Sequence, residues 1–474
     1  MKNTLSLTIL AAALAGAFPA MAQTNAEVLN ELKALRDRVA ELERKLQAAE
    51  AAKPQGGQGA QSQWGMTPDQ VRELNRVTVK TEALEDSRDA LGFKGLKISG
   101  YMDPTFIYNK NQDRAGFQFL NAVGDDGYNY DNSYFGAAVI DFIKETDSGT
   151  RWRLTLAPNR GVGAVFDGQS PIHEASVSIP LGSLQQRLIA GQIPDWSGYE
   201  YLQPTLNKLI THNLLFDFTL PTAYTGAGME ITSGKWIVKG MLANMNTSRK
   251  TSGNKTPVVT YRVDYARGEF QGFGFAGVHG KAANFRADDG VGNPITGLPY
   301  DLKDTRVDLF EVDAYFIRGD WTVQGQLSVG QQKAAAITAD PVTGELRDAR
   351  WYGLSALAAY KWTPRFETTV RADYINNKKN GGGLLGYNFA DDRNGIGPGF
   401  AFDDTSGTWI QPDPERGVNR TAFTFGASWL FNLNTTFKAE YRLDRASQPV
   451  FIDVKDGSYS KTNHLFGASV LVSF

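Results

Sequence analysis

The sequence predicts an all-β transmembrane fold: a 16-stranded antiparallel β-barrel preceded by an α-helical coiled-coil segment. Three observations carry this prediction. Many stretches alternate apolar and polar residues with the two-residue period of a strand that has one apolar face. The connections between these stretches alternate between short and long. The final stretch, from Asn463 to Phe474, ends on an apolar residue, which favours a strand paired on both sides in a closed barrel.

Composition narrows the class of protein. The chain has 474 residues, a net charge of −2 and 42% hydrophobic residues. A balanced charge gives no reason to expect a nucleic-acid partner. After the N-terminal region there is no run of about 20 apolar residues, so helical membrane spans are not expected. The chain contains no Cys, so we expect hydrogen-bonded sheet and packing, without disulfides, to stabilise the fold.

The first 22 residues have the pattern of a secretory signal peptide. Lys2 supplies the basic region, residues 5–18 the apolar region, and Ala20-Met21-Ala22 the cleavage site. A membrane anchor is the alternative, but the apolar region is short for one. We therefore expect the mature chain to be exported.

Two helical segments are predicted before the barrel. Residues 23–53 carry a heptad seam, which we interpret as an intermolecular coiled coil, with a single helix packed on the barrel as the alternative. Residues 54–66 are rich in Gly and Gln and are predicted to be a flexible linker. Residues 67–94 form a second predicted helix, because Thr67 and Gln70 make a capping box and Gly92 suits the C-terminal cap. The heptad seam continues in this helix, with two polar interruptions, through Leu74, Val77, Thr81, Leu84, Arg88 and Leu91.

From residue 95 to residue 474 the period is that of strands. The first strand covers 96–108, with a bulge expected at Pro104 because proline cannot donate to a neighbouring strand. Most strands have the 9–11 residues needed to cross a membrane at a tilt. The remaining predicted strands are 133–143, 150–158, 172–180, 185–192, 225–232, 236–246, 256–269, 272–284, 308–318, 321–334, 351–362, 366–377, 421–431, 435–445 and 463–474.

The connections predict the orientation of the barrel. Eight long loops, the first being Asn109–Asn132, alternate with seven short turns, and both ends of the barrel lie on the short-turn side. Long outer loops and short periplasmic turns are typical of bacterial outer-membrane barrels. Five tryptophans fall near the short-turn ends of their strands, as expected for a ring in the headgroup layer: Trp152, Trp236, Trp321, Trp362 and Trp429.

Charged residues on the alternating faces predict the inner surface. A charge facing lipid near the midplane costs about 2–4 kcal/mol, so these residues are expected to face a water-filled lumen. An ion-pair lattice that stiffens the wall is an equally good interpretation of most of them. The candidate pore-lining residues are Arg151, Arg153, Arg262, Asp264, Glu367, Arg371, Asp373, Lys438, Glu440 and Arg442.

The third long loop, 193–224, is more apolar than an exposed loop should be. It contains Leu206, Leu209, Ile210 and Leu214 at helical spacing. We expect this loop to fold into the lumen and narrow it; the alternative is that it caps the barrel from outside. The candidate polar residues of this constriction are Asp195, Glu200, Lys208, His212 and Asp217.

Taken together, the chain resembles the general 16-stranded porins, and the N-terminal coiled coil resembles that of the phosphate- and pyrophosphate-selective porins. This resemblance implies a homotrimer in the outer membrane of a Gram-negative bacterium, with the N-terminal helices in the periplasm. It also implies an arginine and lysine ladder in the pore. The barrel-assembly machinery would read the last strand through Phe466, Val470, Val472 and Phe474.

Two functional hypotheses follow. The first is a channel for passive diffusion of small polar solutes or ions, with an anion preference if the basic residues set selectivity. The second is a structural tether that links the outer membrane to peptidoglycan through the coiled coil. Paired aspartates in outer loops suit cations that bridge lipopolysaccharide, or are solvated loop charges. The four histidines show no metal-ligand spacing, no cofactor motif is present, and no nucleophile–base pair predicts an enzyme.

Overall fold

The computed structural model describes two units of the chain, residues 1–87 and 88–474, which are treated separately. The described residues are 44, 68–90, 93–111, 113–119, 136–158, 170–246, 256–268, 270–282, 284, 292–300, 304–336, 339–377, 397–413 and 417–474. Apart from Arg44, the predicted signal peptide, coiled coil and linker lie outside these residues.

Helix α3 runs from Pro68 to Ala90, within the range expected for the second helix. Proline suits the first turn of a helix, because its missing N–H has no partner there. Leu74 and Val77, which belong to the expected seam, are half exposed on this helix. Within the described part of the chain, no helix has both the length and the apolar character needed to cross a membrane.

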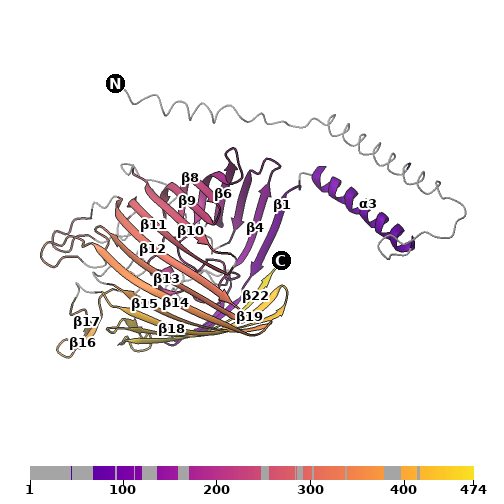
Figure 1. Cartoon of the computed structure of the whole chain (residues 1–474). Helices are drawn as coiled ribbons and strands as arrows, with labels where there is room; N and C mark the ends of the chain where they lie inside the picture. The colour runs from indigo at the N-terminus through magenta and orange to yellow at the C-terminus, as the bar shows by residue number, and fades with distance from the viewer. Residues whose placement is uncertain are drawn as a thin grey trace, which may run out of the picture. The chain divides into compact units, whose positions relative to one another are not determined.

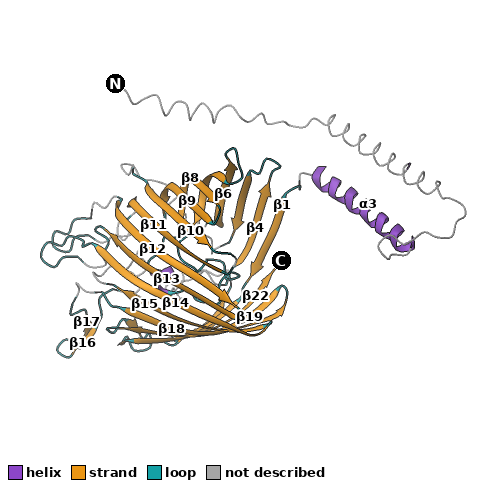
Figure 2. Cartoon of the chain, in the orientation of Figure 1, coloured by secondary structure: helices purple, strands orange, loops and turns teal. Residues whose placement is uncertain are grey.

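The second unit is a closed antiparallel β-barrel (Figures 1 and 2). Its sheet has eighteen strands; β1 and β2 share one position in the wall and β3 and β4 share the next, so the wall has sixteen positions. The first strands are β1 (Leu96–Met102), β2 (Thr105–Asn109), β3 (Arg114–Gln118), β4 (Ala138–Glu145), β5 (Arg151–Leu156), β6 (Ile172–Pro180), β7 (Gln186–Pro194), β8 (Ala223–Ser233) and β9 (Trp236–Met245). The others are β10 (Val258–Ala266), β11 (Gln271–Ala282), β12 (Thr305–Arg318), β13 (Trp321–Gln332), β14 (Ala349–Thr363), β15 (Phe366–Asn376), β18 (Arg420–Asn432), β19 (Thr435–Ala446) and β22 (Thr462–Ser473).

The barrel closes where the last strand meets the first, as the sequence predicts. β22 pairs with β19 on one side and with both β1 and β2 on the other. The first wall position is interrupted at Asp103 and Pro104, the site of the expected bulge. The carboxylate of Asp103 accepts hydrogen bonds from the backbone N–H groups of Gly136 and Ala137, 3.0 and 2.6 Å away. The buried polar groups at this interruption of the strand therefore have hydrogen-bond partners.

One predicted connection is wrong. Residues 109–132 are not a single outer loop, because β3 returns beside β2 after a tight turn in which Asp113 has a φ of 45°. The second wall position is therefore made of β3 and β4. β3 has only five residues and contains Gly116, so its alternation was too short to recognise.

The tryptophans expected at the short-turn ends all have exposed side chains. These are Trp152, Trp236, Trp321, Trp362 and Trp429. Trp236 packs against Tyr265 and Phe273, and Trp429 against Phe431 and Phe437. Exposed aromatic clusters at one end of the wall match the girdle of an outer-membrane barrel.

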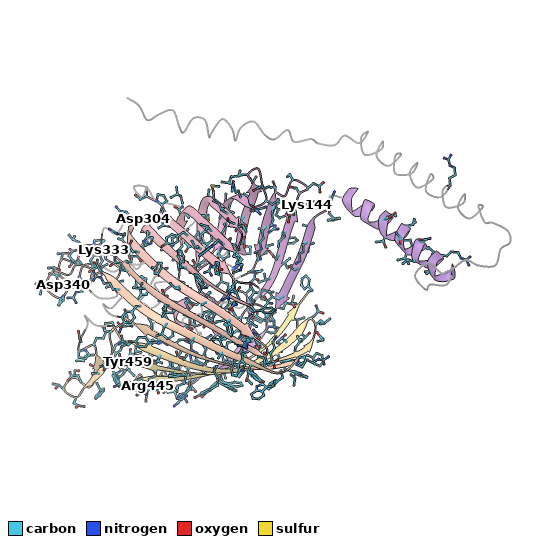
Figure 3. All side chains as sticks on the ribbon, viewed as in Figure 1. Lys144, Asp304, Lys333, Asp340, Arg445 and Tyr459 are labelled. Carbon is cyan, nitrogen blue, oxygen red and sulfur yellow. The ribbon has the colours of Figure 1, made fainter. Side chains whose placement is uncertain are left out.

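Four hairpins at the long-loop end have the same type of turn, which was not predicted from the sequence. In each, Asn or Asp accepts hydrogen bonds from backbone N–H groups two or three residues later, and a Gly four residues later has a φ of +67° to +72°. Such a φ strains any residue with a Cβ atom, which explains the Gly. The turns begin at Asn293, Asp340, Asp403 and Asp453; the last two join β16 (Ala401–Asp403) to β17 (Thr408–Ile410) and β20 (Phe451–Ile452) to β21 (Tyr459–Ser460). Figure 3 shows Asp340 and Tyr459 at this end of the barrel and Lys144 at the other.

Candidate functional site

The connection between β7 and β8 packs against the inner face of the wall. We call residues 195–222 the inner segment. Leu209, Leu214 and Leu215 are almost fully buried, and Ile210 and Leu214 share an apolar cluster with Ile107 and Leu465 of the wall. The short helix α5 (Leu214–Phe218) is capped at its N-terminus by Asn213, whose side chain accepts a hydrogen bond of 2.8 Å from the N–H of Phe216. Leu465, an apolar residue on the inner face of β22, thus packs beneath the segment.

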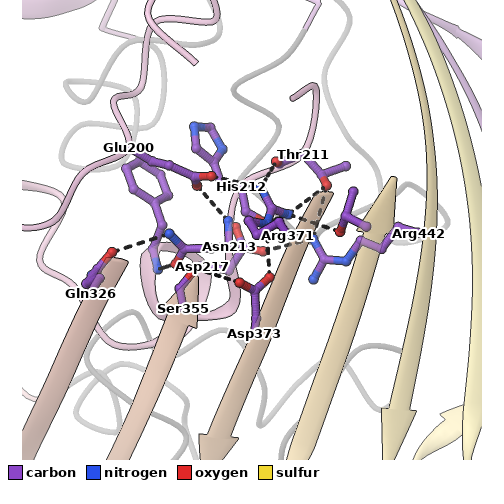
Figure 4. Close-up of polar contacts among 12 residues, drawn as sticks. Glu200, Thr211, His212, Asn213, Asp217, Gln326, Ser355, Arg371, Asp373 and Arg442 are labelled. Carbon is purple, nitrogen blue, oxygen red and sulfur yellow. Dashed lines mark hydrogen bonds and ion pairs between the residues drawn. The ribbon is translucent and has the colours of Figure 1, made fainter. Parts of the chain in front are cut away.

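A buried arginine on β15 holds the centre of this segment (Figure 4). The Arg371 side chain is 0% exposed and forms ion pairs of 2.8 Å with Glu200 and 3.0 Å with Asp373. Its two Nη groups also donate to the backbone carbonyls of Thr211 and His212, at 2.7 and 2.8 Å. A guanidinium offers five donors in a fixed plane, so one side chain satisfies two carboxylates and two carbonyls.

The neighbouring strand β19 adds a second buried arginine and a carboxylate. Arg442 donates to the carbonyl of His212 at 2.8 Å and pairs with Asp444 at 3.1 Å. Its Nη1 lies 3.8 Å from the Asp217 carboxylate of α5. Glu440 accepts from the N–H of Ile210 at 2.6 Å and from the N–H and hydroxyl of Thr211. On the same strand, Glu440 therefore accepts from backbone N–H groups of residues 210–211, and Arg442 donates to the carbonyl of the next residue, His212.

Two lysines hold the first part of the inner segment. Lys438 of β19 donates to the carbonyls of Pro204 and Asn207, both at 2.7 Å. Lys208 of the segment forms a 2.8 Å ion pair with Glu367 of β15. Each contact joins the segment to the wall, so release of the segment would leave buried polar groups without partners.

Two further strands of the wall, β10 and β14, contact the same segment. Arg262 of β10 donates to the carbonyl of Trp196 at 2.7 Å and pairs with Asp313 and Asp264. The Tyr199 hydroxyl lies 2.6 Å from the Ser355 hydroxyl of β14. The inner segment is thus tied to β14, β15 and β19, which lie close together in the wall, and to β10, four positions before β14.

Two glycines in the wall make room for leucines of the inner segment. A Cβ atom at Gly353 would lie 2.4 Å from Cδ2 of Leu215, and one at Gly426 would lie 2.3 Å from Cδ2 of Leu209. Real Cβ atoms do not approach other carbons so closely, so a larger residue would displace the leucine. These glycines match the wall to the packed position of the segment.

The open space lies on the other side of the segment, along β4 to β9. A cavity of about 320 Å³ runs between this wall and the segment, and a second of about 480 Å³ adjoins it toward the short turns. Both are lined by Arg153, Glu174, Ile193, Trp196 and Lys239. We call these two cavities together the passage.

Most of the predicted pore-lining residues do not line the passage. Arg151 and Arg153 do. The structure buries Arg371, Asp373, Lys438, Glu440 and Arg442 beneath or beside the inner segment, and Arg262, Asp264 and Glu367 bond to the same segment or to each other. Of the residues predicted in the third loop, Asp195 and Glu200 line the first cavity, whereas Lys208, His212 and Asp217 are directed at the wall and at neighbouring segment atoms.

Sequence reasoning missed several residues of the passage. Arg187 and Lys239 line it from β7 and β9, and Glu174 and Glu230 from β6 and β8. All four occur in alternating strands, so the period identifies them as possible inward residues. Nothing in the period distinguishes a residue that faces open space from one that lies beneath a folded segment.

Asp195 has a perturbed titration at the start of the inner segment. Its carboxylate accepts from the Tyr224 hydroxyl at 2.6 Å and from the N–H of Ser197 at 2.9 Å. Burial raises the pKa of the Asp195 carboxyl to about 6, although these hydrogen bonds act in the opposite direction. This group therefore changes charge close to neutral pH.

The apolar side chains of the predicted assembly signal lie along β22. Phe466, Val472 and Phe474 are exposed, and Val470 is half buried. Leu471, on the opposite face, packs with Tyr101 and Val139. The recognition of this strand by assembly machinery stays a prediction. Among the described residues, no three His, Asp or Glu side chains are grouped so as to hold a metal ion.

Comparison with known proteins gives a family and a fold. The family model described as "Protein of unknown function (DUF3138)" matches residues 1–474. No curated protein matches the chain. A loop L8 deletion mutant of OmpT, an outer membrane protein of Vibrio cholerae, superposes with a TM-score of 0.51 at 11% identity, over 80% of this chain and 99% of that chain.

Two further solved structures have lower scores. The anion-selective porin from Comamonas acidovorans has a TM-score of 0.47 at 10% identity, over 80% of this chain and 99% of that chain. The outer membrane channel DcaP of Acinetobacter baumannii has a TM-score of 0.48 at 10% identity, over 80% and 97%. At such identities the first likeness shows the fold alone, that of an outer-membrane β-barrel.

Proposed function

The chain belongs to the DUF3138 family of proteins of unknown function, and we propose that it is a porin in the outer membrane of a Gram-negative bacterium. It would form a water-filled channel through which small polar solutes or ions diffuse down their gradients. The observation that carries this proposal is the passage itself: adjoining cavities lined by charged side chains inside a closed barrel. The exposed tryptophans and the outer-membrane barrel fold support the location.

The inner segment is the element that narrows the channel. It occupies the lumen beside β14, β15 and β19, where charged residues are buried, and the passage lies along β4 to β9. The numerous contacts to the wall support a fixed constriction, because each would leave a buried polar group unpaired if broken.

The passage is proposed to prefer anions. In its ion pairs the cation is the more exposed partner: Arg153 is 32% exposed against 11% for Asp141 and 13% for Glu174, and Lys239 is 32% exposed against 27% for Glu230. Arg187 adds a guanidinium that donates to Ser178 and to the carbonyl of Gly149, both neutral. Water in the passage therefore meets positive charge first.

Two variants that each remove one positive charge test this preference. Lys239→Gln should move the reversal potential in a KCl gradient toward cations, because it removes an exposed charge from both cavities. Lys144→Gln is the matched control. Lys144 lies on β4 between Ile143 and Glu145, which both line the passage, so its own side chain is on the other face of the strand. Equal reversal potentials for the wild type and both variants would contradict a selectivity set in the passage.

We further propose a homotrimer whose N-terminal helices lie in the periplasm. The exposed Leu74 and Val77 of α3 support an apolar seam for other copies of the helix. Contacts with lipopolysaccharide, with the assembly machinery and with peptidoglycan stay predictions, as does the structural tether. Cross-linking of the full-length protein in native membranes would test the trimer.

A further inference from the structure

The passage has two chemically different sides. One side is the wall of β4 to β9, which contributes Arg151, Arg153, Arg187 and Lys239 together with the carboxylates paired to them. The other side is the inner segment. Its contribution to the first cavity is dominated by apolar and aromatic side chains: Trp196, Tyr201, Leu202, Leu206, Phe216 and Pro221.

The apolar side is open to the passage. Leu206 is 57% exposed and Tyr201 is 54% exposed, although both lie in a segment that packs inside the barrel. An apolar surface in contact with water raises the free energy of the protein unless a solute covers it. Exposed apolar side chains in a solute pathway therefore favour solutes that carry an apolar body.

The charged residues that the inner segment places at the first cavity are bonded within the chain. Asp195, which lines the cavity, accepts from the Tyr224 hydroxyl and from the N–H of Ser197. Glu200, which borders the cavity, pairs with Arg371 at 2.8 Å and accepts from the N–H of Asn213 at 2.6 Å. Lys208 pairs with Glu367 on the wall. Besides these paired charges, the segment presents mainly hydrocarbon to the solute. It faces a wall in whose ion pairs the cation is the more exposed partner.

We propose that the passage selects amphipathic organic anions: small molecules with an aromatic or branched hydrocarbon body and a single carboxylate. The carboxylate would bind to Arg153 and Lys239 while the hydrocarbon body lies on Leu206 and Trp196. This inference rests on the proposed porin function and specifies its substrate class.

Bi-ionic reversal potentials of purified full-length protein in planar bilayers test the proposal, with potassium benzoate, potassium acetate and benzylammonium chloride as the probes. Acetate is smaller and diffuses faster, so a passage that sorts by size and charge alone would prefer it. The proposal predicts a benzoate permeability at least equal to that of acetate, with benzylammonium poorly permeant.

Leu206→Ser should lower the benzoate-to-acetate ratio by about fivefold, the factor expected for a few tens of Å² of lost apolar contact. Leu433→Ser, at a 93% exposed leucine in a short turn, is the matched control and should leave the ratio unchanged. Lys239→Gln should reduce the permeability of both anions relative to potassium.

The outcomes separate the two proposals. If the protein conducts KCl but acetate is preferred over benzoate, or if Leu206→Ser leaves the ratio unchanged, the substrate class is wrong and the porin function stands. If benzylammonium permeates as well as benzoate, the role of the basic wall is wrong. Absence of KCl conductance would overturn the porin function itself.

Discussion

Arg371→Gln should release the inner segment from the wall. The wild-type guanidinium is fully buried and bonds to Glu200, Asp373 and the carbonyls of Thr211 and His212. Glutamine is shorter and uncharged, so both carboxylates would lose their buried counter-charge. Breaking a buried pair in this way typically costs about 3–5 kcal/mol. Because the ladder hydrogen bonds of β15 are made by its backbone, the cost falls on the attachment of the segment.

The assay is single-channel recording combined with limited proteolysis of the purified protein. Release of the segment should raise the conductance, add rapid current fluctuations and expose residues 195–222 to protease, while the circular dichroism of the barrel stays that of the wild type. Arg76→Gln is the control: its pair with Glu73 on α3 is 61% and 59% exposed, so its loss should change stability by about 1 kcal/mol or less. Wild-type conductance and protease resistance in Arg371→Gln would refute the assignment of this residue to the segment.

Further predictions concern packing, titration and assembly. Gly426→Val should displace Leu209 and raise the conductance, with an overpacking cost of about 1–3 kcal/mol, and Leu209→Ala in the same chain should restore wild-type recordings; no rescue would refute the steric argument. The pKa of Asp195 is higher in the packed segment than in a free chain, so protonation of this carboxyl stabilises the packed state. The stabilisation is fully present below about pH 4 and is lost as the pH rises through about 6. The difference between 3.8 and about 6 corresponds to about 3 kcal/mol, so protease resistance of the segment should depend less on pH in Asp195→Asn; an unchanged pH profile would argue against this titration. Leu74→Asp should weaken cross-linked trimers and Val79→Asp, outside the expected seam, should not; equal effects would exclude the seam.

The wall of the barrel was predictable because one physical rule acts along its whole length. A strand between lipid and water must alternate, and β6 matches the predicted 172–180 while the other long strands match within a few residues. β3 was not predicted, because its five residues, with Gly116 at the centre, are too few to show an alternation of apolar and polar side chains. The four turns of the same type were not predicted, because each lies in a short hairpin whose strands are too short to show an alternation of apolar and polar residues. Their Asx hydrogen bonds depend on that hairpin.

The candidate site was less predictable, since alternation shows only that a side chain points inward. Arg153 and Arg371 have the same pattern in sequence, yet Arg153 borders open space and Arg371 is buried under the inner segment. The difference comes from a connection between β7 and β8 whose contacts span more than 200 residues of sequence, such as Thr211 with Glu440. The apolar run around Leu209 and Leu214 indicated that the loop must pack somewhere, but not which charged residues it would cover.

Stepwise conductance of the purified full-length protein in a planar bilayer tests the central claim most directly. A closed barrel with a charged passage along β4 to β9 predicts discrete current steps in KCl, with a reversal potential in a salt gradient displaced toward anions. Folded, membrane-inserted protein that produces no steps above the bilayer background would contradict the channel, and steps with a cation preference would contradict the charge assignment of the passage.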